Sequence, residues 1–284
     1  MIILAATPIG NLGDVTRRLV EALENATVVA AEDTRTTQRL LAGLGITNRP
    51  RLIAVHDHNE KERAAEIIAL AETDDVLVIS DAGMPTVSDP GYGLVSAAIA
   101  AGVTVTALPG PSAVLTALAV AGLPTDRFTF EGFLPRKPAE RRAQLVALSS
   151  ETRTMVFFES PARTGAALVD MAAAFGDDRQ GAVCRELTKF YEEVVRGPVA
   201  ELAKWAEDGV RGEVVLVVGG SHEEPVSFPA AVAQVTELVA AGGRLKEAVR
   251  EVAGHTGHSS RDLYQAALGA KGPGAKAPGN KDSA

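Results

Sequence analysis

The sequence predicts an α/β protein made of two α/β domains, followed by a small C-terminal helical segment. Three observations lead to this prediction. Short apolar runs alternate with helical patterns up to Gly122, which is typical of a mostly parallel sheet covered on both faces. After Gly122 the strands become aromatic and their spacing changes, which indicates a second α/β domain with a mixed sheet. From Pro225 onward every pattern is helical.

Apolar runs and end signals place the elements of the first domain. Strands are predicted at residues 2–6, 27–31, 52–55, 76–79 and 103–108. Helices are predicted from a cap at Asp14, over 34–44 with Gly45 as the stop, from an Asn59–Glu62 capping box to 71, over 92–101, and from Pro111 to Gly122.

The same signals place the rest of the chain. Strands are expected at 128–133, 154–158, 182–187 and 214–218, with helices at 139–148, 164–175 and 199–207. Tail helices are expected at 229–241, 244–253 and 259–268. The predicted boundaries are 1–117 and 118–224 for the two α/β domains, 225–268 for the helical segment, and 269–284 for a disordered end rich in Gly, Pro, Lys and Ala.

Bulk composition limits the class of protein. The 284 residues are enough for two domains, and 46% hydrophobic with 23% charged residues is typical of a globular protein. No apolar run reaches the ~18 residues of a membrane span, and the start of the chain lacks the basic region of a signal peptide. One cysteine, Cys184, excludes an internal disulfide, so we expect a cytoplasmic protein. A net charge of −8 argues against nucleic-acid binding by bulk electrostatics but allows a local basic patch.

Four loops with unusual sequences follow strands of the first domain. Ligands of open parallel sheets bind outside the carboxyl ends of the strands, so four such loops at one edge indicate a binding site. The first loop could hold an anion on its backbone N–H groups, but it does not match G-x-G-x-x-G, and the chain has no P-loop motif. A standard dinucleotide or triphosphate site is therefore disfavoured. The four loops span residues 7–14, 32–35, 80–91 and 109–112.

The third loop reads SDAGMPTVSDPG and is long, acidic and stiffened by proline. Its carboxylates, Asp81 and Asp89, suit a cationic or hydroxyl-rich ligand, such as a sulfonium cofactor with a ribose and an amino group. Alternatively, the two aspartates cap amides of their own loop. In the second loop, Glu32 and Asp33 stand beside Arg35, and here too Asp33 could simply cap the following helix.

Two further clusters are considered for metal and for RNA. His56 and His58 flank Asp57, but a metal site needs more ligands, so we expect no metal. Basic residues could contact phosphates, or could belong to solvated helix faces. They lie after the aromatic strand at Arg136, Lys137, Arg141 and Arg142, and in the tail at Arg244, Lys246, Arg250 and Arg261.

Seven motifs occur in an order that matches a known family. They read ATPIGNLGD, AEDTRTT, SDAGMPTVSDPG, LPGPSA, GFLPRK, FFESP and CRELTK. Together they resemble the ribosomal RNA small-subunit methyltransferase I group of the tetrapyrrole-methylase-like superfamily, over residues 2–220. The tail from Lys246 to Leu268 also resembles the C-terminal helices of that group. The first loop reads Pro8-Ile9-Gly10-Asn11 rather than GxGxG or GPGD, which points to the rRNA branch.

The resemblance implies a function. Members of the family bind S-adenosylmethionine (SAM) in a cleft between two α/β domains and form homodimers. The rRNA group is similar to enzymes that methylate the ribose 2′-hydroxyl of a decoding-centre cytidine in 16S rRNA of the small ribosomal subunit. We therefore expect SAM as cofactor, 16S rRNA in the small subunit as partner, a homodimer, and no membrane.

The expected site residues lie in the matched motifs and in the two basic clusters. Candidate general bases are Asp33, Glu32 and Glu159, and Arg35 is a further catalytic candidate that could hold a flanking phosphate. Expected RNA contacts are Arg136, Lys137, Arg141, Arg142 and Arg261. Expected cofactor contacts are Pro8, Asp81, Met84, Val87, Ser88, Pro111, Ser112, Glu159 and Leu187.

Two other classes of function remain open from the sequence. A small-molecule C-methyltransferase acting on a tetrapyrrole would need an open apolar cleft and no basic tail. A non-enzymatic ribosome-binding factor would keep the fold without binding SAM.

Overall fold

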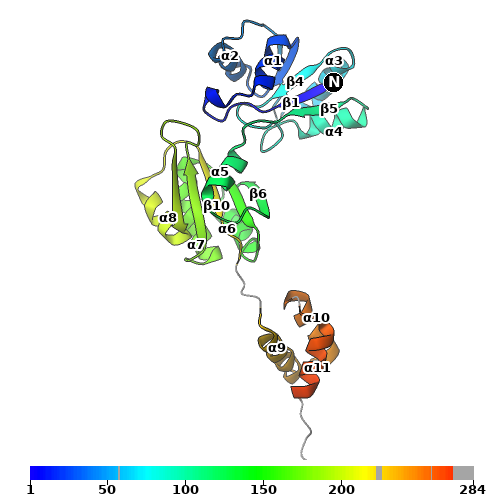
Figure 1. Ribbon diagram of the computed structural model, residues 1–284, viewed down its shortest axis with the longest axis vertical. Coiled ribbons are helices and arrows are strands. Elements are labelled where there is room, and N and C mark those ends of the chain that lie inside the picture. Colours follow the sequence, from blue (N-terminus) through cyan, green and yellow to red (C-terminus); the bar gives the residue numbers. More distant parts are fainter. Residues whose placement is uncertain (57, 222–225, 257, 271–284) are drawn as a thin grey trace, which may run out of the picture. The chain divides into compact units, whose positions relative to one another are not determined.

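The computed structural model describes residues 1–56, 58–221, 226–256 and 258–270. They fall into two compact units that divide after Ser221. The first unit holds two β-sheets with their helices, and the second holds the last three helices (Figure 1). Within the described residues, no helix is long and apolar enough to cross a membrane.

The first sheet is wholly parallel, with strand order β3-β2-β4-β1-β5. Its central strands β2 and β4 are buried along their whole length, as expected for strands covered on both faces. The helices α1 and α2 cover one face and α3 and α4 the other. The strands are β1 (Ile2–Ala5), β2 (Val28–Ala31), β3 (Arg51–Ala54), β4 (Val76–Ile79) and β5 (Val105–Leu108). The helices are α1 (Arg17–Asn25), α2 (Thr34–Gly43), α3 (Glu60–Thr73) and α4 (Tyr92–Ala100).

One predicted helix cap is wrong, and another stands at the predicted position without its capping bond. The cap of α1 is Thr16, whose hydroxyl accepts from the Leu19 N–H at 3.1 Å, while Asp14 lies in a preceding 3₁₀ turn. Asn59 precedes α3 but makes no cap bond, because its amide oxygen accepts from the His56 N–H and its amide group donates to a strand carbonyl. Asn59 bonds instead to nearby backbone groups, and Asp14 lies inside a local turn, so neither side chain caps a helix.

The second sheet is mixed, as predicted, with strand order β6-β7-β10-β8-β9. Only β6 and β7 are parallel, and the other pairs are antiparallel. The strand β9 was missed from the sequence because its residues EVVRGP carry charges, and because the strand lies half-buried at the sheet edge. The strands are β6 (Phe128–Phe133), β7 (Thr154–Glu159), β8 (Gln180–Arg185), β9 (Glu193–Pro198) and β10 (Val214–Val218).

Helices cover both faces of the second sheet. Successive residues of β7, such as Val156 and Phe157, point to opposite faces and enter two different apolar clusters. One cluster includes α6 (Pro138–Ala147), α7 (Pro161–Phe175) and α8 (Val199–Trp205), and the other includes α5 (Ala113–Ala121). The predicted boundary between 117 and 118 falls inside α5. Since α5 packs on the second sheet, we propose a boundary just before Ser112, the residue that caps it.

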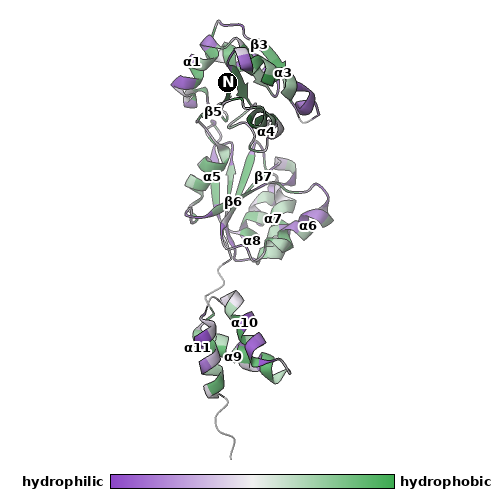
Figure 2. Ribbon diagram, turned by 90° about the vertical axis from the view of Figure 1, so that its right-hand side faces the viewer, coloured by the Kyte–Doolittle hydropathy of each residue, from purple (hydrophilic) through white to green (hydrophobic). Residues whose placement is uncertain are grey.

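The second unit is a three-helix cluster. Its helices are α9 (Phe228–Ala240), α10 (Leu245–Thr256) and α11 (Ser260–Ala270), and each carries both apolar and hydrophilic residues (Figure 2). Val235, Val252 and Leu263 are fully buried between them. The segment predicted to be disordered, 269–284, begins inside α11, and its residues 271–284 lie outside the described part of the chain.

The core of the second sheet gives a stability prediction. Phe157 is fully buried in the α6–α8 cluster, whereas Phe190 is 92% exposed. Phe157→Ala should lower the free energy of unfolding by ~3–5 kcal/mol, because it removes buried apolar surface and leaves a cavity. Phe190→Ala, the matched control, should change it by less than ~0.5 kcal/mol. Urea titration of both variants checks this, and equal effects would contradict the assigned core.

Candidate functional site

The four predicted loops lie at one edge of the first sheet, and hydrogen bonds join three of them. Since β1, β2, β4 and β5 are parallel neighbours, the loops that follow them leave from the same edge. Thr7 and Gly83 exchange backbone hydrogen bonds of 2.9 and 3.1 Å, which joins the first loop to the third. The Asp33 N–H donates to the Asp81 carboxylate at 3.2 Å, which joins the second loop to the third. The expected gathering of these loops is therefore confirmed.

A cavity of about 680 Å³, here called the first cavity, lies where these loops meet the second sheet. Its walls come from the loop 80–91, the start of α5, and the ends of β7, β8 and β10. Apolar side chains form much of the lining, at Met84, Val87, Phe133, Phe158 and Leu187. The volume and the apolar lining are those of a small-molecule site.

The charged groups of the first cavity are mostly acidic. Asp89, Glu159, Glu186 and Glu213 line it, and Lys189 is the one cation among the lining residues. The Lys189 ammonium pairs with Glu186 at 2.9 Å and with Glu213 at 3.0 Å. Desolvation alone would lower the pKa of Lys189, but the bonds to these two carboxylates outweigh it and raise that pKa. Glu159 is itself paired with Arg163, and the carboxylates still outnumber the cations, which favours a cationic ligand.

Four non-glycine residues beside the first cavity have left-handed backbone conformations. Thr86 and Ser88 lie in the loop 80–91, with φ of 76° and 65°. Glu186 and Thr188 follow β8, with φ of 50° and 69°. Such conformations are uncommon outside glycine and persist where the surroundings hold them. The Glu186 side chain accepts from the Glu213 N–H at 2.8 Å, which fixes one of them.

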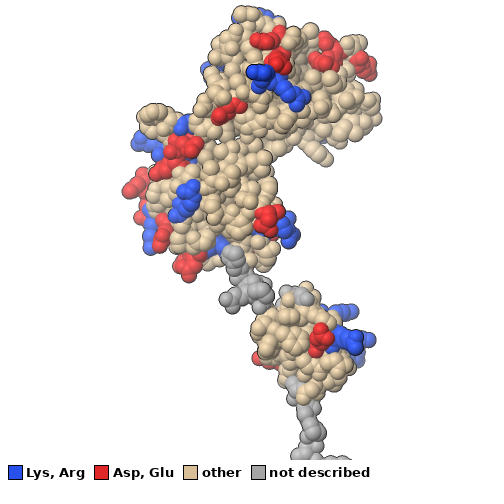
Figure 3. Space-filling view, in the orientation of Figure 1, with Lys and Arg blue, Asp and Glu red and all other residues tan. Residues whose placement is uncertain are grey.

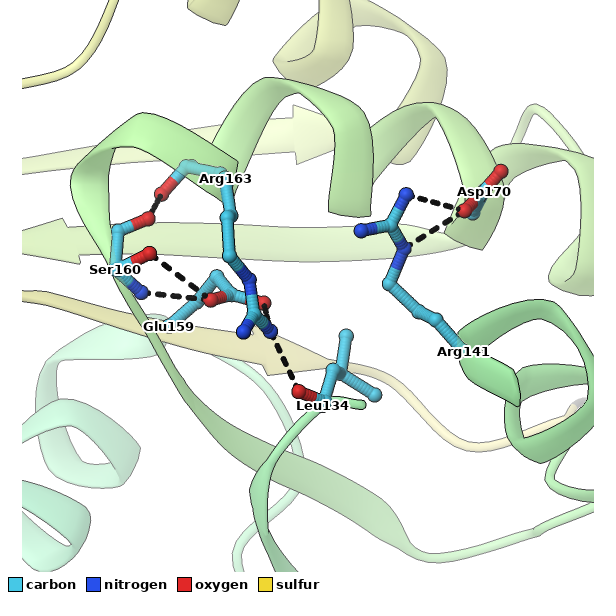
Figure 4. A network of polar contacts seen from close by, with 7 residues as sticks. Leu134, Arg141, Glu159, Ser160, Arg163 and Asp170 are labelled. Atoms are coloured by element: carbon cyan, nitrogen blue, oxygen red, sulfur yellow. Dashed lines mark hydrogen bonds and ion pairs between the residues drawn. The ribbon is translucent and has the colours of Figure 1, made fainter. Parts of the chain in front are cut away.

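Glu159 ends β7 and lies in a network of polar contacts (Figure 4). Its side chain is fully buried, and its oxygens accept from the Ser160 N–H at 2.7 Å and from the Arg163 guanidinium at 2.8 Å. Arg163 also donates to the Leu134 carbonyl at 2.5 Å. Because both carboxylate oxygens already accept hydrogen bonds, Glu159 is suited to holding the cavity wall rather than to removing a proton.

The buried cysteine also reaches this wall. Cys184 lines the first cavity from β8, and burial raises the pKa of its thiol to about 11. The thiol is therefore neutral near pH 7 and is not a nucleophile there.

A second cavity of about 400 Å³ adjoins the first. It is lined by the loop 7–14, by α2 and by the end of β4. Four residues line both cavities, namely Ile9, Ala82, Lys189 and Glu213.

All but one of the expected cofactor contacts line one of the two cavities. Pro8 and Asp81 line the second cavity rather than the first, and Pro111 lines neither. The Asp81 carboxylate accepts from the Asp33 N–H and is thereby turned toward the second loop. The others line the first cavity, namely Met84, Val87, Ser88, Ser112, Glu159 and Leu187.

The second loop holds a capping pair. Asp33 caps α2 by accepting from the Arg35 N–H at 2.8 Å, and it pairs with the Arg35 guanidinium at 2.6 Å. These bonds, the guanidinium first, lower the pKa of Asp33 to about 2. A carboxylate with that pKa is a weak base, so the capping alternative describes Asp33 better than the catalytic one. Asp33, Glu32 and Arg35 line neither cavity.

The expected RNA contacts differ in exposure. Arg136, Lys137 and Arg142 are exposed, although Lys137 pairs with Glu140 at 2.8 Å. Arg141 is only 6% exposed and pairs with Asp170 at 2.7 Å (Figure 4), so its inclusion was wrong. The spacing 141–142 puts one side chain of the pair on the buried face of α6.

The helical unit presents the remaining expected contact. Arg261 is exposed on α11, and the face of this unit drawn in Figure 3 shows basic side chains beside acidic ones. The expectation for Arg261 therefore stays a prediction.

Three residues that line or hold the candidate site are not among those expected from the sequence. Arg39 lines the second cavity from α2, Lys189 lies between the two cavities, and Arg163 fixes Glu159. Helical spacing was an available signal for two of them. Arg39 lies four residues after Arg35, and Arg163 lies four after Glu159, so each lies one helical turn from a residue that the sequence analysis names.

The histidines after β3 give no metal centre that the structure describes. The rings of His56 and His58 stand 6.2 Å apart, and Asp57 lies outside the described residues. Among residues with described positions, no group of three or more metal-ligating side chains is present.

Comparisons with known proteins agree with this architecture. Residues 1–203 match the family of Tetrapyrrole (Corrin/Porphyrin) Methylases. The ribosomal RNA small subunit methyltransferase I of Mycobacterium tuberculosis (strain CDC 1551 / Oshkosh) is 52% identical over 271 residues, which cover 94% of each chain. This chain belongs to the ribosomal RNA small subunit methyltransferase I group of the tetrapyrrole methylases. The group's enzyme from Escherichia coli O157:H7 is 43% identical over 95% of each chain, and residues 226–271 match the RsmI C-terminal HTH domain.

Solved structures share the fold of this group. The methyltransferase CobJ has a TM-score of 0.58 at 22% identity, covering 78% of this chain and 94% of its own. Uroporphyrin-III C-methyltransferase from Thermus thermophilus, complexed with S-adenyl homocysteine, has a TM-score of 0.53 at 20% identity, covering 77% and 96%. The family consists of SAM-dependent methyltransferases.

The pairing of Glu159 with Arg163 leads to a prediction about the stability of the protein. Arg163→Met should lower the free energy of unfolding by ~3 kcal/mol near pH 7, because it leaves the buried Glu159 carboxylate without its cation. The double variant Glu159→Gln/Arg163→Met should recover part of that loss, since a neutral amide needs no counter-charge. Urea unfolding of the wild type, both single variants and the double variant checks this. Strictly additive losses would show that the two side chains do not act together.

Proposed function

We propose that this chain methylates the ribose 2′-hydroxyl of a decoding-centre cytidine in the 16S rRNA of the small ribosomal subunit, with SAM held in the first cavity. The observation that carries the proposal is an acid-rich cavity, walled by both α/β domains, in a chain that shares 52% identity with a ribosomal RNA small subunit methyltransferase I. The choice of cytidine and of the ribose oxygen rests on the resemblance of the seven motifs.

The residues of the first cavity fit this cofactor. When bound, SAM supplies an electrophilic methyl group on a positively charged sulfur, and its departing thioether is neutral. The carboxylates Asp89, Glu186 and Glu213 favour that positive charge. Met84 and Leu187 provide apolar surface. The left-handed backbone of the loop 80–91 keeps this wall in shape before binding, which reduces the ordering cost.

The acceptor hydroxyl is weakly acidic and reacts well only when its proton is removed or polarised. Orientation of the two reactants supplies a large part of the rate. The exposed cations Arg136, Lys137, Arg142 and Arg261 are proposed to bind RNA phosphates. Since the 2′-hydroxyl must be accessible, the target is a single-stranded or distorted segment. We further propose a homodimer acting in the cytoplasm.

The test of this function is methyl transfer to ribosomal subunits. Labelled methyl from SAM should be incorporated into small subunits that lack the modification, and not into subunits that already carry it. The label should make one phosphodiester beside a decoding-centre cytidine resistant to alkali. Absence of transfer to subunits and to naked rRNA, with SAM binding intact, would overturn the proposal in favour of a small-molecule acceptor.

The charge of the first cavity gives a separate prediction. Asp89→Asn should weaken binding of SAM about 5-fold more than binding of S-adenosylhomocysteine, because only SAM carries the sulfonium charge; 5-fold corresponds to ~1 kcal/mol. Asp208→Asn, an exposed aspartate that lines neither cavity, should change neither affinity. Calorimetric titration with both ligands checks this. Equal losses for SAM and S-adenosylhomocysteine would contradict an electrostatic role of Asp89.

A further inference from the structure

The second cavity adjoins the proposed cofactor cavity through a common wall. Ile9 and Ala82 line both cavities from the first domain, and Lys189 and Glu213 line both from the second. Methyl transfer requires the reacting atoms to approach to about 3–3.5 Å, so donor and acceptor must meet at a common boundary. With the cofactor in the first cavity, the second cavity is where an acceptor can reach the methyl group.

The common wall is held in place by close packing between the two domains. Gly10, in the first loop, has a φ of 141°, and a Cβ at this position would lie 2.5 Å from the Lys189 Cε. The stem of Lys189 therefore lies directly on the Gly10 backbone, and its ammonium is fixed by Glu186 and Glu213. No larger residue fits at Gly10 without moving Lys189.

The second cavity differs from the first in its balance of charge. Arg39 and Lys189 are cations and Asp81 and Glu213 are anions, whereas the first cavity has four carboxylates and one cation. Arg39 is exposed, and among the described residues its guanidinium makes no hydrogen bond or ion pair that the structure shows. A planar guanidinium without a partner suits a phosphate, which it binds through two parallel hydrogen bonds.

Asp81 and Glu213 are the two carboxylates that line this cavity, and Asp81 comes from the first domain. Its own N–H donates to Glu32 at 3.4 Å, and one of its oxygens accepts from the Asp33 N–H at 3.2 Å, which fixes the side chain. Desolvation raises the pKa of Asp81, although the Asp33 N–H works against it. Asp81 is thus a stronger base than Asp33. The charged groups near it are Glu32, Asp33 and Arg35 of the second loop, and Arg39, Lys189 and Glu213 of the cavity lining.

We infer that the second cavity receives the acceptor nucleotide, with Arg39 binding a phosphate and Asp81 accepting the proton of the ribose hydroxyl. This inference rests on the proposed function. In the transfer, the ribose oxygen forms a bond to the methyl carbon while the carbon–sulfur bond breaks and its electron pair stays on sulfur. The hydroxyl proton passes to the Asp81 carboxylate and from there to solvent. The reaction needs no further reactant.

The test separates binding of the acceptor from its deprotonation. Arg39→Met should raise the KM for small subunits at least 10-fold and leave the SAM affinity unchanged. It should also reduce the slope of log binding constant against log salt concentration by about 1, because one phosphate contact is lost. Arg18→Met, an exposed arginine of α1 that lines neither cavity, is the matched control and should leave all three quantities unchanged.

Asp81→Asn should lower the single-turnover rate by 10²–10⁴-fold, as expected for loss of a general base, and leave the SAM affinity within about 3-fold. In the wild type, the rate should fall as the pH drops through the pKa of Asp81, because the base must be unprotonated. That fall should vanish in Asp81→Asn. Normal rates in both variants would overturn the inference while the proposed function stands.

If the wild-type enzyme fails to methylate subunits, nucleotide binding in the second cavity can still be tested. A short cytidine-containing oligoribonucleotide, titrated in the presence of S-adenosylhomocysteine, then serves as the probe. Binding that is weakened at least 5-fold by Arg39→Met and not by Arg18→Met would support a nucleotide site in the second cavity. Equal binding to all three proteins would overturn it.

Discussion

The salt bridges of Lys189 with Glu186 and Glu213 are the interaction on which the site depends. Lys189 belongs to the loop after β8 in the second domain, yet its stem packs on Gly10 in the first. Its two carboxylate partners fix the ammonium between the two cavities. This arrangement supplies the second domain's part of the common wall, opposite Ile9 and Ala82 of the first domain. Glu186, which has a left-handed backbone conformation, bonds to both Lys189 and the Glu213 N–H.

Most of the fold was predictable because apolar periodicity determines it. The buried strand β4 was placed at its observed ends from four consecutive apolar residues. The strand β9 could not be found this way, since an edge strand is covered on fewer sides and tolerates charged residues such as Glu193 and Arg196. The caps at Asp14 and Asn59 failed for another reason. A side-chain oxygen near a helix start has several possible partners, and the sequence does not say which of them lies nearby.

The site was predictable at the level of loops but not of individual charges. Parallel topology brings the four loops together whatever their side chains do, so their gathering followed from strand order. The role of each carboxylate depends on distances that only the folded chain defines. Asp33 is neutralised by Arg35, two residues away, and Glu159 by Arg163, one helical turn away. Asp81 has no such cation beside it in the sequence, and it lies in the second cavity rather than the first.

The common wall of the two cavities has a thermodynamic consequence. Lys189 and Glu213 are exposed to the contents of both cavities, so a ligand in one that shifts these side chains changes the free energy of binding in the other. Such coupling is reciprocal by necessity, and each ligand alters the affinity of the other by the same factor. Through Lys189 and Glu213 the two cavities therefore form one thermodynamic unit, in which the affinity of each cavity depends on the occupancy of the other.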